Sequence, residues 1–378
     1  MPMKRNVLIE VNTRSWKRKR VPAKLSALDG TVRQMDVELA LLHTAIWTRP
    51  PNYTGFDLAD CWAWLRYARA FDSGPDLRLR NEWTHIDPHQ KTILSDEVGV
   101  GFTTCLFWEI LDFNDYADTL SVRDVLPDKF RLKGSKKVGP RKSPDYIARD
   151  RQGRFSILEC KGTQTSVNVL EAAIRKGVSQ KRNIVPVAGT KLAHSLVAGL
   201  FIPQASSNEQ ATVCISDPEA DEHSGPISGV PAEDLTIAMT QISLAKQFAL
   251  IGFVSVANEL AAGPIEKSSE LQDALRAYLR ILRQINRDYL EFETRLPLPP
   301  EDLREHAPAS ATAILFNASA PFTLIDRLAN GGDLRAELLK LSDLSARTPW
   351  ETVITDTSVK LRSPYGFSFG LIYEGPMA

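Results

Sequence analysis

The fold of this chain is decided by two short runs, Ser143–Ile147 (SPDYI) and Phe155–Gly162 (FSILECKG). Both runs contain the β-branched and aromatic residues that favour strands. The stretch between them, Asp150–Arg154, is polar and contains a glycine, which is typical of a hairpin loop. We therefore expect the two runs to form an antiparallel β-hairpin.

This hairpin would bring charged side chains together. Side chains alternate across a strand, so Glu159 and Lys161 lie on one face of the second strand. Folding the hairpin about Gln152 places Asp145 directly opposite Glu159, because each lies seven residues from that centre. Two carboxylates and one ammonium are thus expected at one point of the sheet.

This set of groups suits the hydrolysis of a phosphodiester. The reaction needs charge neutralisation on the phosphate, a hydroxide near neutral pH and a stabilised alkoxide, and carboxylate-held Mg²⁺ serves all three. Asp145, Glu159 and the backbone carbonyl of Cys160 are the candidate metal ligands. Lys161 could deprotonate the attacking water through a lowered pKa or could bind the phosphate, and the sequence leaves both roles open.

On these residues the chain resembles the PD-(D/E)XK superfamily, the restriction-endonuclease-like group of restriction enzymes, repair nucleases, junction resolvases and phage-defence nucleases. Pro144-Asp145 matches the PD element, and Glu159-Cys160-Lys161 matches the E-x-K element after a hydrophobic strand. The resemblance covers about residues 90–216. It implies a mixed α/β fold with an αβββαβ core, and a nuclease that uses Mg²⁺, for which Mn²⁺ substitutes.

Many members carry a further acid on the helix before the sheet, which corresponds here to Leu94–Cys105. The resemblance implies that Glu97 is an additional catalytic acid and metal ligand, with Asp96 as the second choice. Helical spacing places Glu97 on one face with Gly101, Thr104, Cys105 and Trp108. The simpler interpretation is that both acids stand in the first turn after an N-cap at Ser95, where they suit the helix dipole.

A helix is expected over Ser166–Arg182, followed by strands over Leu196–Pro203 and Ala211–Ser216. The polar side of this helix carries candidate nucleic-acid contacts, namely Arg175, Lys176, Gln180, Lys181 and Arg182. The resemblance makes Gln180 a candidate for a functional glutamine. A solvated polar face is the alternative.

The net charge is zero, but the basic residues are clustered. Residues 123–142 hold eight Lys or Arg against two acids, residues 1–34 hold nine against two, and residues 192–245 hold none. This layout favours binding of a phosphate backbone, and ordinary solvated surface is the alternative. The candidate contacts just before the hairpin are Lys136, Lys137, Arg141 and Lys142.

Length and composition suggest two or three domains, since the chain has 378 residues, 43% of them hydrophobic and 24% charged. Its four cysteines are isolated, which argues against a zinc or disulfide framework. With no signal sequence and no apolar run of about 18 residues, a cytoplasmic protein without membrane contact is expected. The expected segments are a basic, Trp-rich helical N-terminal region (1–85), a nuclease core (86–218), a helical hairpin (219–296) and a small α+β region (297–378).

The helical hairpin is expected over residues 234–262 and 268–295. Its second helix repeats apolar residues at alternating steps of four and three, at Leu271, Leu275, Tyr278, Leu282, Ile285 and Tyr289. This seam packs either on the preceding helix or, through residues 268–292, on a second copy of the chain. A homodimer would supply a second active site for cutting both strands.

Together these features predict a Mg²⁺-dependent nuclease, with DNA as the preferred substrate. The unfamiliar flanking regions and the lack of a helicase motor favour an endonuclease of restriction or phage-defence type, working with a partner protein of a defence system. One alternative is a catalytically silent nuclease-like fold that binds nucleic acid or acts as a scaffold in a complex. A chance motif in an unrelated hydrolase is the other.

Overall fold

In the computed structural model the two runs form the expected hairpin, β4 (Tyr146–Asp150) and β5 (Phe155–Thr163). The strands pair antiparallel, with Tyr146 opposite Leu158. Gly153 turns the loop with a φ of 74°, a left-handed conformation that glycine adopts without steric cost. The structure describes residues 4–16, 20–51, 67, 70–130, 143–181, 189–190, 192–217, 227–228, 231–265, 269–284, 289–297 and 311–375.

The hairpin lies in a seven-stranded mixed sheet of order β2-β1-β8-β7-β5-β4-β3. β5 is parallel to β7 and β1 is parallel to β8, while the other neighbours are antiparallel. The mixed α/β class is confirmed, as are the two strands expected after the helix. The other strands are β1 (Lys4–Val11), β2 (Thr31–Asp36), β3 (Phe113–Asp118), β7 (Leu192–Phe201) and β8 (Thr212–Ser216).

The N-terminal region is not the purely helical segment that the sequence predicted. Its β1 and β2 form an antiparallel pair that extends the sheet beyond β8. Val7, Ile9 and Val11 are buried at alternate positions of β1, which is the period of a half-buried strand. The prediction failed because β1 gains its stability by pairing with β8, some 200 residues away in sequence.

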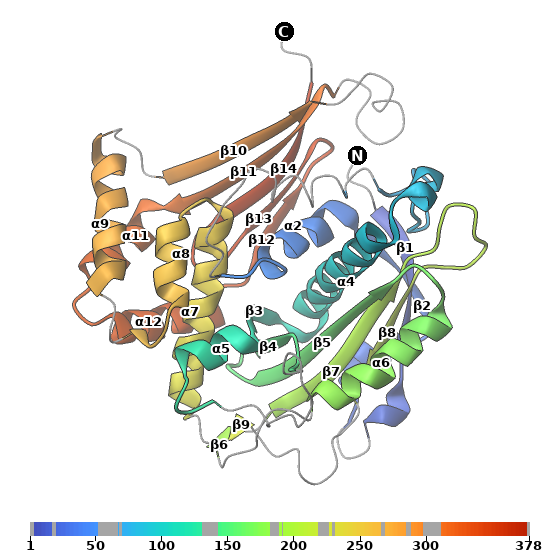
Figure 1. The fold of residues 1–378 in the computed structure, drawn as a ribbon, viewed down its shortest axis with the longest axis horizontal. Helices are drawn as coiled ribbons and strands as arrows, with labels where there is room; N and C mark the ends of the chain where they lie inside the picture. Colours follow the sequence, from blue (N-terminus) through green and yellow to red (C-terminus); the bar gives the residue numbers. More distant parts are fainter. Residues whose placement is uncertain are drawn as a thin grey trace.

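Two helices, α2 (Val37–Trp47) and α7 (Ala232–Leu250), lie between the two sheets of the molecule (Figure 1). Every residue of α2 is buried, because the chain covers it on all sides. Its first turn is capped by Asp36, whose Oδ1 accepts the Leu39 N–H at 2.8 Å. The other helices described before residue 266 are α1 (Ala23–Ser26), α4 (Pro88–Leu111), α5 (Thr119–Val125), α6 (Val167–Lys181) and α8 (Val254–Ala261), with 3₁₀ turns η1 (Thr13–Ser15) and η2 (Asn81–His85).

The helix that precedes the central strands begins earlier than the sequence predicted. In α4, Asp87 is the N-cap and accepts the His89 N–H at 2.8 Å, with Pro88 at the first helical position. Ser95 lies inside the helix, and its hydroxyl donates to the Lys91 carbonyl at 2.8 Å. The interpretation of Ser95 as an N-cap is therefore wrong, and Asp96 and Glu97 do not stand in a first helical turn.

The C-terminal part forms a second, five-stranded antiparallel sheet of order β10-β11-β14-β13-β12. The helix predicted over residues 268–295 ends at Gln284, because Tyr289–Pro297 is strand β10, which pairs along its whole length with β11. The other elements are β11 (Ala313–Pro321), β12 (Glu351–Ile354), β13 (Ser358–Arg362), β14 (Ser368–Glu374), α9 (Ser269–Gln284), α11 (Phe322–Asn330) and α12 (Leu334–Arg347), with a separate short pair β6 (Gly189–Thr190) and β9 (Ile227–Ser228).

The apolar seam of α9 packs within the chain. Of the predicted seam residues, Leu271 and Leu275 are buried, as is Leu279 beside them, and α9 contacts α8 and α11. Tyr278 packs on Phe253, with the two ring centroids 3.9 Å apart. The buried seam residues are therefore not open to a second copy, and the homodimer through residues 268–292 stays a prediction.

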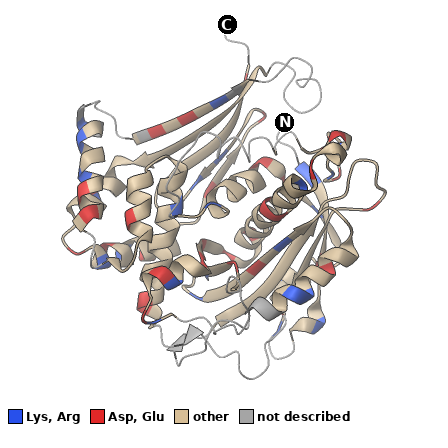
Figure 2. Cartoon of the chain, viewed as in Figure 1, with Lys and Arg blue, Asp and Glu red and all other residues tan. Residues whose placement is uncertain are grey.

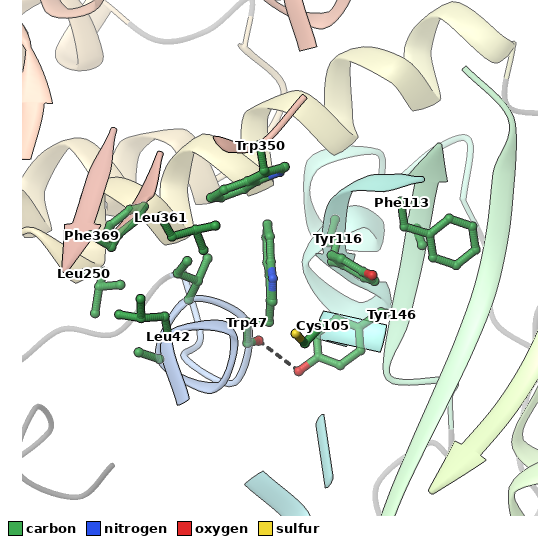
Figure 3. Packing of buried hydrophobic residues seen from close by; sticks show 14 of the residues in the cluster. Leu42, Trp47, Cys105, Phe113, Tyr116, Tyr146, Leu250, Trp350, Leu361 and Phe369 are labelled. Atoms are coloured by element: carbon green, nitrogen blue, oxygen red, sulfur yellow. Dashed lines mark hydrogen bonds between the residues drawn. The ribbon is translucent and has the colours of Figure 1, made fainter. Parts of the chain in front are cut away.

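One continuous hydrophobic cluster extends from Val7 in β1 to Tyr373 in β14. Its middle is Trp47 at the end of α2, which contacts Tyr116 of β3 at 5.0 Å and Trp350 at 6.0 Å between ring centroids (Figure 3). The two sheets are thus joined by a shared core. Within the described ranges, every helix is too short or too polar to cross a bilayer.

A buried ion pair fastens the C-terminal part to the hairpin. Arg149 of β4 pairs with Asp115 of β3, and both side chains are almost fully shielded from solvent. Asp115 also accepts hydrogen bonds from Ser243 at 3.0 Å, Ser345 at 3.0 Å and Tyr365 at 2.8 Å. We call Asp115 and Arg149 the β3–β4 ion pair.

Breaking the β3–β4 ion pair should destabilise the whole chain. The variant Arg149→Met leaves the Asp115 carboxylate buried without its cation, a change that costs about 3–5 kcal/mol of unfolding free energy. The matched control is Arg154→Met on the same hairpin. The Arg154 side chain is half exposed, so its ion pair with Asp150 is worth under about 1 kcal/mol. Urea denaturation measures both, and equal losses would contradict the assignment.

His43 should make the protein less stable in acid. It is buried in α2, where neither ring nitrogen has a hydrogen-bond partner among the described residues, and burial lowers its pKa to about 3. The unfolded imidazole titrates near 6.5, so between these values only the unfolded chain binds the proton. The free energy of unfolding therefore decreases as the pH is lowered below 6.5, by about 1.4 kcal/mol per pH unit.

The variant His43→Gln removes this proton uptake. Between pH 7 and pH 5 we expect the parent to lose about 2 kcal/mol more unfolding free energy than the variant. Urea denaturation at both pH values measures the difference. Equal losses in the two proteins would show that His43 is not buried as a neutral ring.

Candidate active site

The hairpin brings Asp145 and Glu159 together as the sequence predicted. The β4–β5 register continues by one step to place Asp145 opposite Glu159. The Asp145 N–H donates to Glu159 Oε2 at 3.1 Å, and the Cys160 N–H donates to Asp145 Oδ2 at 2.8 Å. Lys161 Nζ donates to Glu159 Oε1. Asp145, Glu159 and Lys161 thus form one cluster, which we call the candidate site.

Helix α6 covers the face of the sheet that carries Glu159 and Lys161. A Cβ atom at Gly177 of α6 would lie 3.0 Å from Glu159 Cγ and 3.6 Å from Lys161 Cε. The Glu159 side chain is completely buried, while that of Lys161 keeps 23% of its surface exposed. The ammonium therefore lies between the buried carboxylate and the solvent.

Helix α4 packs on the opposite face of the same strand. A Cβ atom at Gly162 would lie 1.7 Å from the Ser95 carbonyl oxygen, and one at Gly99 would lie 2.6 Å from the Lys161 carbonyl oxygen. Glycine is required at these positions by the close approach of two backbones. Strand β5 is thus held between α4 and α6.

The electrostatics of the candidate site are dominated by burial and by the two carboxylates. Burial first, and the charge of Asp145 second, raise the pKa of Glu159 to about 7. Burial also raises the pKa of Asp145. Burial lowers the pKa of Lys161, but the two carboxylates outweigh it and the pKa is raised overall, so the side chain is an ammonium. This state favours phosphate binding over proton abstraction.

The donor set fits a hard divalent cation. Asp145 and Glu159 present carboxylate oxygens from adjacent strands, and Mg²⁺ is commonly held by one or two carboxylates plus water. Their pKa values are raised chiefly by burial, and a bound cation would stabilise the charged form of both groups. No group of three Asp, Glu, His or Cys side chains suited to a metal exists among the described residues.

Cys160 contributes its backbone to the site. Its N–H holds Asp145, while its thiol is buried, and burial raises the thiol pKa well above the usual value. Its carbonyl as a metal ligand stays a prediction.

The role of Glu97 as a metal ligand stays a prediction. Glu97 acts electrostatically on Tyr146, the residue after Asp145. The neighbouring Asp96 interacts electrostatically with Lys161 and Asp145. The fold thus brings both acids close to the residues of the candidate site.

The predicted nucleic-acid contacts are only partly described. Lys136, Lys137, Arg141, Lys142 and Arg182 lie outside the described residues, as do the side chains of Gln180 and Lys181. Arg175 and Lys176 are exposed on α6, where Figure 2 shows Lys and Arg in blue. Arg175 pairs with Glu171 at 3.4 Å.

The sequence analysis missed two charged residues beside the candidate site. Asp118, at the end of β3, is among the charges that raise the pKa of Asp145. Lys246 of α7 pairs with Asp118 at 2.7 Å and is completely buried. One feature of the sequence could have identified Lys246: the 54 residues before it, 192–245, contain no Lys or Arg.

Comparison with protein-family models, curated proteins and solved structures found no match in any of the three.

The close contact of α4 with β5 gives a stability prediction. Gly162→Ala drives a methyl group into the Ser95 carbonyl and should cost about 1–3 kcal/mol of unfolding free energy through overpacking. Gly332→Ala is the matched control, because nothing lies within 4 Å of the added Cβ. Thermal and urea denaturation measure both. Unchanged stability of Gly162→Ala would show that the helix does not contact the strand so closely.

Proposed function

We propose that this protein is a metal-dependent nuclease that hydrolyses phosphodiester bonds of nucleic acid, most specifically a DNA endonuclease. The observation that carries the proposal is the cluster of Asp145, Glu159 and Lys161 on adjacent strands. A buried and a half-buried carboxylate beside an ammonium match the needs of the reaction, because one part of the site attracts a cation and the other attracts a phosphate.

The order of elements supports the proposal. Helix α4 is followed by β3, β4 and β5, then by α6 and β7, with the short α5 inserted after β3. This order is compatible with the αβββαβ core that the PD-(D/E)XK resemblance implies. The additional strands β1, β2 and β8, and the whole second sheet, are elaborations around such a core.

Each side chain has a role that its position supports. Asp145 and Glu159 would hold Mg²⁺, which when bound supplies a Lewis acid for the phosphate and lowers the pKa of water. Lys161, kept as an ammonium by the two carboxylates, would bind a non-bridging phosphate oxygen. The Cys160 N–H and the Glu159 carboxylate orient Asp145 through its side chain and its backbone.

The alternative is a nuclease-like fold that binds nucleic acid or scaffolds a complex without cutting. It is favoured by one observation: both oxygens of Glu159 already accept hydrogen bonds, from Lys161 and from the Asp145 N–H. A restriction or phage-defence role with a partner protein belongs to the same proposal and rests on the resemblance alone. The cytoplasmic location expected from the sequence also stays a proposal.

The decisive experiment is cleavage of plasmid, linear duplex, single-stranded DNA and RNA in Mg²⁺, Mn²⁺ or EDTA. We expect metal-dependent cutting of DNA that falls at least 100-fold in Lys161→Ala and in Asp145→Ala, about 2.7 kcal/mol of barrier. Lys360→Ala is the matched control, because Lys360 is exposed on β13, far along the chain from the cluster. It should cut like the parent.

Other outcomes separate the alternatives. Tight DNA binding without cutting in any metal would favour the silent fold. Cutting that survives in both Lys161→Ala and Asp145→Ala would assign the activity to another site or to a contaminant. A protein that neither binds nor cuts nucleic acid would indicate that the motif matches by chance.

A further inference from the structure

Lys246 is a buried charge that the proposed reaction does not use. Its side chain is completely shielded from solvent in the middle of α7. The ammonium donates to the Trp47 carbonyl at 2.8 Å and to the Arg49 carbonyl at 2.7 Å, and it pairs with Asp118 Oδ2 at 2.7 Å. We call Asp118 and Lys246 the α7 ion pair.

Part of this arrangement caps a helix. Trp47 is the last residue of α2, where carbonyls have no partner inside the helix and carry partial negative charge. A neutral donor is sufficient for that task. Gln241, on the same α7, donates to the Leu260 carbonyl at 2.5 Å and the Gly263 carbonyl at 2.8 Å at the end of α8.

Helix capping therefore does not explain the charge of Lys246. A buried ion pair contributes little net stability compared with a neutral replacement, because desolvation offsets the attraction between the charges. The presence of Asp118 as the partner needs another reason.

That reason is suggested by the position of Asp118 beside Asp145. Asp118 stands opposite Tyr146 in the β3–β4 register, and the next residue, Thr119, donates its N–H to the Asp145 carbonyl at 3.1 Å. The end of β3 is thus linked through the backbone to Asp145 and to the residue that follows it, Tyr146.

Tyr146 is held by the same group of contacts. Its hydroxyl donates to the Trp47 carbonyl at 2.8 Å (Figure 3), and Lys246 Nζ lies 5.6 Å from the centre of its ring. Lys246 therefore contacts Tyr146, which follows Asp145, and Asp118, which pairs with Tyr146 across β3 and β4.

We propose, on the basis of the proposed nuclease function, that the α7 ion pair is a positioning device that fixes the backbone of Asp145 so that its carboxylate meets Glu159. Asp118 and Lys246 are positioning residues in this scheme and do not touch the substrate. The C-terminal half of the chain thereby takes part in assembling the candidate site.

The test is a double-mutant cycle with Asp118→Asn, Lys246→Met and the double variant. Single-turnover cleavage of DNA is measured at saturating Mg²⁺ and substrate, DNA affinity is measured in EDTA, and folding is followed by circular dichroism. We expect each folded single variant to cut at least tenfold more slowly with unchanged DNA affinity. The double variant should lose no more than the worse single variant, because both changes remove one interaction.

A matched control separates positioning from stability. Gln241→Met removes a buried donor to two carbonyls from the same helix, at the end of α8 instead of the end of α2. It should lower the melting temperature and leave the cleavage rate unchanged. If Lys246→Met does not fold, Asp118→Asn and Gln241→Met carry the test, because Asp118 keeps a quarter of its surface exposed.

Several outcomes would overturn the inference. A cleavage rate in folded Asp118→Asn within twofold of the parent would show that Asp145 does not need the pair. Independent, multiplicative losses in the double variant would show two unrelated effects. A parent that cuts no substrate would overturn the proposed function, and this inference with it.

Discussion

The candidate site depends on one constraint, the register of β4 against β5. A slip of one residue would move Glu159 and Lys161 to the face that α4 covers and would separate Asp145 from Glu159. The loop fixes this register locally, because Asp150 accepts the backbone N–H groups of Gln152 and Arg154 and also the Arg154 guanidinium. The glycine contacts with α4 and α6 fix it from both faces, since either helix would clash with a side chain one position out of place.

The same register sets how the rest of the molecule attaches. With β4 in place, Arg149 pairs with Asp115 and donates to Ser342 of α12, while Asp115 accepts from Ser243 of α7 and Ser345 of α12. The β3–β4 ion pair therefore makes the edge of the seven-stranded sheet a docking surface for the C-terminal part. Because the hydrophobic cluster is continuous from β1 to β14, loosening this edge would affect both sheets.

The hairpin and its cluster were predictable because they are local: a two-residue alternation and a loop of five residues place Asp145 opposite Glu159. The strands β1 and β10 could not be predicted in this way, because each pairs with a strand that is distant in sequence. Basic residues concealed the alternation of β1, and a helical apolar period concealed that of β10. The role of Glu97 stays a prediction. Helical spacing gives the face of α4 on which it lies, and the contact of Gly101 with α2 fixes how that face is turned.

Three clusters of shielded charge lie along β3, β4 and β5, and their balance distinguishes them. The β3–β4 ion pair and the α7 ion pair each match one carboxylate with one cation, and each is completed by neutral donors or acceptors. The candidate site instead has two carboxylates for one ammonium, and Asp96 and Asp118 add to the negative field at Asp145. In a cluster that served structure alone, the second carboxylate would only add a desolvation cost. Burial first, and the charge of Asp145 second, raise the pKa of Glu159 to about 7. This surplus of negative charge supports the proposed divalent cation, which would offset it.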